Sequence, residues 1–71
     1  MRDGRSHDPR TNINDATYDE LRKTRQIGEV LARRIIETRH QRQFCTWEDV
    51  QHITGIGRLR VRYLQEEFSL F

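Results

Sequence analysis

The chain has 71 residues, of which 34% are charged, with a formal net charge of +2. A core of this size is marginal, so we expect one small domain. The 17 Leu, Ile, Val and Phe residues place it above the level at which disorder is expected. No apolar run is long enough for a membrane span or a signal-peptide core. Twelve Arg against one Lys favour contacts with phosphate or carboxylate groups, although arginine also decorates ordinary helix surfaces.

The single cysteine, Cys45, excludes an intramolecular disulfide and argues against a cysteine-based zinc site. It follows Phe44, and we expect a buried or half-buried thiol with no chemical role. His7, His40 and His52 show no ligand spacing with one another, so neither a metal nor a cofactor is expected. The sequence does not fix a location, and the default expectation is a soluble protein in the reducing cytoplasm or nucleus.

The N-terminal residues 1–12 are polar and aperiodic, and we expect them to form a flexible tail before an ordered domain at 13–71. Thr17 and Glu20 then have the spacing of a capping box, in which each side chain binds the other residue's backbone N–H. This pair predicts a short first helix that carries Leu21.

A second helix is predicted from Gly28 to about His40, and a third begins after the weaker cap Thr46-x-x-Asp49. The last helix is predicted from about Arg58 onward. No stretch alternates with period two, so the fold class is all-α. The apolar residues assigned to the core are Ile27, Val30, Leu31, Ile35, Val50, Ile56, Val61 and Leu64.

An internal repeat relates the two halves of the domain. Thr17 matches Thr46 and Gly28 matches Gly57 at one constant offset, as in 57 − 28 = 29 residues. A repeat of this length is one supersecondary unit used twice. Each copy is predicted to contain a capped short helix, a turn around Ile-Gly, and a second helix.

The stretch Ile53-Thr54-Gly55-Ile56-Gly57 resembles the helix-hairpin-helix motif. Over residues 13 to 68 the chain resembles the tandem helix-hairpin-helix domain of the bacterial competence DNA-uptake receptors and their relatives. The wider resemblance is carried by Ile13 to Thr17, Glu20, Leu21, Ile27, Gly28, Ala32, Ile35, Ile36, Arg39, Phe44, Thr46, Glu48 to Val50, and Gly55 to Gly57. It implies a compact domain of two units related by a pseudo-twofold, and sequence-independent binding to the sugar–phosphate backbone of DNA.

The second hairpin has the features of a phosphate site. Glycine permits positive φ and a close backbone approach, and free N–H groups at a helix start attract a phosphate oxygen. We expect the amides around Gly55, Gly57 and Arg58 to bind, supported by the Arg58 and Arg62 side chains. The structural alternatives are glycines that only satisfy a tight turn, and an i,i+4 pairing of Arg62 with Glu66. Arg33 and Glu37 have the same spacing.

The first hairpin departs from the family pattern. Where the family shows Leu-Pro-Gly-Ile-Gly, this chain has Arg25 in place of Pro and Gln26 in place of the first Gly. Glu29 follows Gly28 and competes with an anion at the helix start. Gly28 and Arg25 remain candidate nucleic-acid contacts, but we expect the first hairpin to be mainly structural.

The sequence thus predicts an accessory module that binds DNA, most readily double-stranded, without sequence specificity. No nucleophile lies beside a base, and the acidic pairs fall in first helical turns, so no enzymatic activity is expected. One alternative is a protein-interaction or structural module, with Phe68, Leu70 and Phe71 either as an apolar docking patch or as the last piece of core. Another is a non-catalytic domain of a nuclease or repair enzyme.

Overall fold

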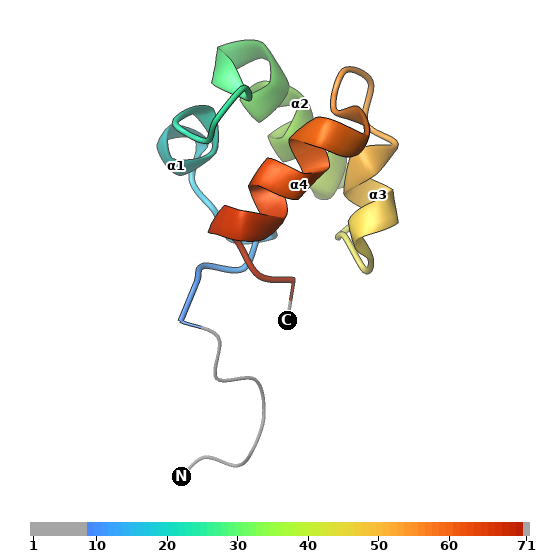
Figure 1. The fold of residues 1–71 in the computed structure, drawn as a ribbon. Helices are drawn as coiled ribbons and strands as arrows, with labels where there is room; N and C mark the ends of the chain where they lie inside the picture. Colours follow the sequence, from blue (N-terminus) through green and yellow to red (C-terminus); the bar gives the residue numbers. More distant parts are fainter. Residues whose placement is uncertain (1–8, 71) are drawn as a thin grey trace, which may run out of the picture.

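The computed structural model describes residues 9–70, and within this range the chain forms helices without a named strand (Figure 1). The helices are α1 (Tyr18–Arg22), α2 (Gly28–Gln41), α3 (Trp47–Gln51) and α4 (Gly57–Glu67). A short helix precedes a long one in each copy of the repeat. The all-α prediction is confirmed, and the helix limits lie within a residue or two of those expected.

Both short helices begin with a complete capping box. Thr17 Oγ1 accepts from the Glu20 amide at 3.1 Å, and Glu20 Oε1 accepts from the Thr17 amide at 2.9 Å. Thr46 and Asp49 exchange the same two hydrogen bonds at 3.2 and 3.1 Å. These bonds satisfy N–H groups that a helix start leaves without an intrahelical partner. The side chains at the starts of α1 and α3 are therefore already used within the protein.

The core forms where α1 packs on α2 and α3 packs on α4. Its fully buried side chains include the repeat-related pair Leu21 and Val50 and the pair Ile35 and Leu64. Tyr18 and Trp47, which also match across the repeat, are half-buried and pack against this cluster. The buried apolar residues are Ile13, Ala16, Leu21, Ile27, Ala32, Ile35, Phe44, Val50, Ile53, Ile56, Val61, Leu64, Phe68 and Leu70.

Two expectations about burial are wrong. The sequence pattern predicts Val30 in the core, but this residue is 59% exposed. Ala32 faces the core at full burial, and two helical residues span about 200°, so Val30 points to the other side of α2. Cys45 is exposed rather than buried, because its neighbour Phe44 enters the core and its own amide donates to Asp49 Oδ2 at 2.8 Å, outside the core.

The two ends of the described chain pair with each other. The Ile13 amide donates to the Ser69 carbonyl at 2.8 Å, and the Ser69 amide donates to the Thr11 carbonyl at 2.9 Å. Residues 11 and 12 therefore belong to the folded body, while most of the expected tail, residues 1–8, lies outside the described range. Phe68 and Leu70 are buried beside this pairing, so they are core residues. Phe71, the third member of the expected docking patch, lies outside the described residues.

Candidate nucleic-acid interface

The two hairpin turns, residues 23–27 and 52–56, lie at the end of the molecule opposite the paired chain ends (Figure 1). Each turn closes through a backbone hydrogen bond, from the Ile27 amide to the Thr24 carbonyl and from the Ile56 amide to the Ile53 carbonyl, both at 3.0 Å. Ile27 and Ile56 are buried and anchor the turns to the core. The long helices α2 and α4 begin directly after these anchors.

The backbone turns through positive φ twice in each hairpin. Gly28 and Gly57, the first residues of α2 and α4, have φ of 66° and 63°. Two residues earlier, Gln26 has φ of 62° and Gly55 has φ of 95°. Gln26 therefore adopts the left-handed conformation that the first hairpin needs, despite carrying a side chain. Gln26 stands where the family pattern has glycine, and this replacement adds backbone strain to the first turn. The first turn nevertheless keeps positive φ at the same position as the second turn.

The long helices begin without a side-chain cap, in contrast to α1 and α3. Ile27 and Ile56 occupy the N-cap positions of α2 and α4, and neither can accept a hydrogen bond through its side chain. The first amides of these helices are therefore free of a capping side chain and carry the positive end of the helix dipole. Gly28 and Gly57 are exposed, so a phosphate oxygen can approach both helix starts.

The charges around the two helix starts differ. The first turn of α4 contains no acidic residue, and Arg58 lies within it. The first turn of α2 contains Glu29. The α4 start is therefore the more favourable place for an anion.

Two of the three arginines of α4, Arg58 and Arg62, are available to a ligand. Arg58 and Arg62 are exposed, and neither forms a hydrogen bond or ion pair within residues 9–70. The alternative pairing of Arg62 with Glu66 is thus not formed in this part of the chain. Arg33 does not pair with Glu37 either, and its guanidinium lies 5.8 Å from the centroid of the Tyr18 ring.

Contacts between the two units recur at the spacing of the repeat. Arg34 in α2 donates from Nη1 to the Thr54 carbonyl of the second turn at 2.9 Å. The equivalent residues are Tyr63 in α4 and Arg25 in the first turn, and the Arg25 guanidinium lies 4.8 Å from the centroid of the Tyr63 ring. Each turn therefore rests on the long helix of the other unit. Arg25, an expected nucleic-acid contact, also has this internal role, which local spacing did not indicate.

A second pair of contacts follows the same rule. Arg60 in α4 donates from Nε to the Gln26 carbonyl at 2.9 Å. The equivalent pair is Leu31 in α2 and Gly55, where a Cβ atom would lie only 2.8 Å from Leu31 Cδ2. A side chain at Gly55 would thus have to displace the end of the Leu31 side chain, in addition to the strain of a positive φ. A Cβ atom at Gly57 would meet nothing within 4 Å, so the space beside it is open to a ligand.

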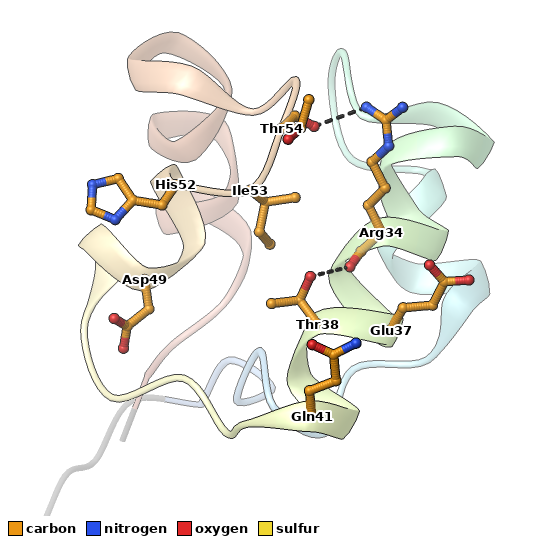
Figure 2. A pocket seen from close by; sticks show the side chains of 8 residues that line it. All are labelled: Arg34, Glu37, Thr38, Gln41, Asp49, His52, Ile53 and Thr54. Atoms are coloured by element: carbon orange, nitrogen blue, oxygen red, sulfur yellow. Dashed lines mark hydrogen bonds between the residues drawn. The ribbon is translucent and has the colours of Figure 1, made fainter.

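A groove between α2 and α3 opens beside the second turn (Figure 2). Thr38 Oγ1 donates to the Arg34 carbonyl at 2.7 Å on one wall, and Asp49 and His52 line the other. The groove carries the negative charges of Glu37 and Asp49 beside the positive charge of Arg34. It is therefore poorly suited to a polyanion. We therefore place the candidate interface at the helix starts and not in this groove.

Other kinds of site receive no support from residues 9–70. In that range no three His, Cys, Asp or Glu side chains gather as metal ligands would. The helices of the described segment also lack the combined length and apolar character that a membrane crossing requires.

Comparison with known families identifies this architecture. A family model for the helix-hairpin-helix motif matches residues 7–69, and the chain therefore belongs to the helix-hairpin-helix family. Comparisons with curated proteins and with solved structures give no match. The narrower resemblance to competence DNA-uptake receptors stays a prediction.

Proposed function

We propose that this domain binds double-stranded DNA without sequence specificity, as an accessory binding module rather than an enzyme. The observation that carries the proposal is the contrast between its helix starts. Both short helices use side chains to cap their amides, whereas α2 and α4 begin at exposed glycines with no side-chain cap. Amides of this kind bind phosphate and position a protein on the backbone without reading bases.

The second hairpin is the stronger of the two proposed contacts. At the start of α4 a phosphate meets the amides around Gly57 and the exposed guanidinium of Arg58, with Arg62 one turn further on the same side. At the start of α2, Glu29 opposes the same interaction at Gly28. We infer that a pseudo-twofold relates the units, because the contacts between them recur at the repeat offset. The two hairpins of the proposed interface therefore have similar backbone conformations but differ in the charge at their helix starts.

The decisive experiment is fluorescence anisotropy of a labelled DNA duplex titrated with the domain at several salt concentrations. Phosphate binding predicts a linear fall of log affinity with log salt, and a slope equivalent to about two to four phosphates fits this interface. Arg58→Gln and Arg62→Gln should each weaken binding and lower the slope by about one. Affinity should not depend on the duplex sequence.

Arg42→Gln is the matched control. Arg42 is exposed at the C-cap of α2, at the far end of that helix from Gly28, and its replacement removes the same charge. It should change the slope by much less than either α4 variant. Absence of binding at low salt would contradict the proposal. Equal losses for Arg42→Gln and Arg58→Gln would show that binding depends on overall charge and not on the α4 start.

A further inference from the structure

Two apolar side chains lie exposed in a protein whose other large aliphatic residues are mostly packed. Within residues 9–70 the exposed large hydrophobic residues are Val30, at 59%, and Leu59, at 50%. They match across the repeat, since each is the third residue of a long helix. Both helices therefore expose an aliphatic side chain in the first turn after the hairpin.

The direction of a helical side chain places both residues beside the proposed phosphate contacts. Every Cα–Cβ bond in an α-helix tilts toward the helix N-terminus, so Val30 and Leu59 cover surface next to the first-turn amides. Leu59 is also flanked by Arg58 and lies one turn before Arg62, and both arginines are exposed. Binding of a purely apolar partner would remove these arginine charges from water without a compensating contact. A polyanion that also carries aliphatic carbon atoms would complement both the arginines and the apolar side chains.

The carbon atoms nearest to a backbone phosphate are those of the adjoining sugars. We propose that Val30 and Leu59 pack against deoxyribose carbons on either side of the bound phosphates and thereby select DNA over RNA. This inference rests on the proposed function. The 2′-hydroxyl of RNA would be placed against an alkyl group that offers it no hydrogen bond, and that hydroxyl is one of the features by which proteins distinguish the two polymers.

The test compares matched DNA and RNA duplexes of one sequence, titrated by anisotropy with the parent and with a Val30→Ser, Leu59→Ser double variant. The parent should bind DNA more tightly, and the double variant should lose about tenfold of that affinity. Its affinity for RNA should change by less than about twofold. The salt slopes should not change, because no charge is removed.

Two controls separate this contact from other causes of selectivity. A Val30→Ile, Leu59→Met variant keeps apolar side chains at both positions and should retain the preference for DNA. Thermal melts of the serine variant should match the parent, since both side chains are exposed. If the DNA-to-RNA affinity ratio of the serine variant equals that of the parent, duplex shape causes the selectivity and the inference fails. If the parent binds neither duplex, the proposed function itself fails.

Discussion

Arg60 donates a hydrogen bond from its Nε atom to the carbonyl oxygen of Gln26, 2.9 Å away, and so joins α4 to the first hairpin turn. Gln26 is the non-glycine residue with positive φ in the described chain, at 62°. The left-handed conformation costs an L-residue about 1–2 kcal/mol. Contacts with the other unit therefore help to hold a turn that its own residues disfavour, and the equivalent position in the second turn, Gly55, needs no such compensation.

Gln26→Gly should stabilise the domain. Glycine removes the left-handed strain but adds about 0.5–1 kcal/mol of chain entropy in the unfolded state, so the unfolding free energy should rise by about 0–1.5 kcal/mol. Thermal and urea melts measure the change. Gln26→Ala is the control, because alanine removes the same polar side chain and keeps the strain. An alanine variant as stable as the glycine variant would show that the side chain, and not the backbone conformation, matters.

Gly55→Ala should cost more stability than Gly57→Ala. Both positions have positive φ, so each substitution should lose about 1 kcal/mol through strain. At Gly55 the new Cβ would also lie 2.8 Å from Leu31 Cδ2 and 3.0 Å from Arg34 Nη1, and these side chains must move. We expect a total loss of about 2 kcal/mol there. Urea denaturation of the two variants checks the order, and equal losses would contradict the packing argument.

Local sequence chemistry was enough to predict the elements. The spacing of Thr17 to Glu20 and of Thr46 to Asp49 fixed both short helices, because a capping box uses residues only three apart. Local sequence chemistry does not determine which apolar residues are buried. Val30 and Leu31 are adjacent and both aliphatic, and only the way α2 packs on the other elements turns Val30 outward.

The candidate site was predictable in part for the same reason. The hairpin pattern indicates Gly55 and Gly57, and helical spacing places Arg58 and Arg62 on one side of α4. The contacts of Arg34 with Thr54 and of Arg25 with Tyr63 join residues of different units, and their formation depends on how the units pack. No short-range pattern specifies that packing. The burial of Phe68 and Leu70 likewise depends on pairing between the two ends of the described chain.

Phe68→Ala should destabilise the domain instead of changing its association. Phe68 is 5% exposed, and its amide donates to the Leu64 carbonyl at 2.8 Å at the end of α4. Removing a buried Phe side chain typically costs about 3–5 kcal/mol. Urea denaturation measures the loss, and sedimentation at several protein concentrations tests association. A variant of unchanged stability whose mass falls relative to the parent at high concentration would restore the docking interpretation.

The pH dependence of stability should include a contribution from Asp49. Hydrogen bonds from the Cys45 and Thr46 amides hold the pKa of Asp49 below its usual value in the folded protein. Since the folded pKa is lowered, this stabilisation is fully present above the unfolded pKa of about 3.9 and is lost as pH falls through the folded value.

Asp49→Asn isolates this contribution, because the asparagine side chain keeps an acceptor but cannot titrate. The difference in melting temperature between parent and variant should be constant above about pH 5 and should shrink as the parent is acidified below about pH 4. Glu48→Gln is a suitable control, since Glu48 is an exposed acidic residue in the same first turn that takes no part in the capping box. If the Asp49→Asn difference persists unchanged at low pH, the cap acts through the neutral hydrogen bond alone. Its charge would then contribute nothing to the stability of α3.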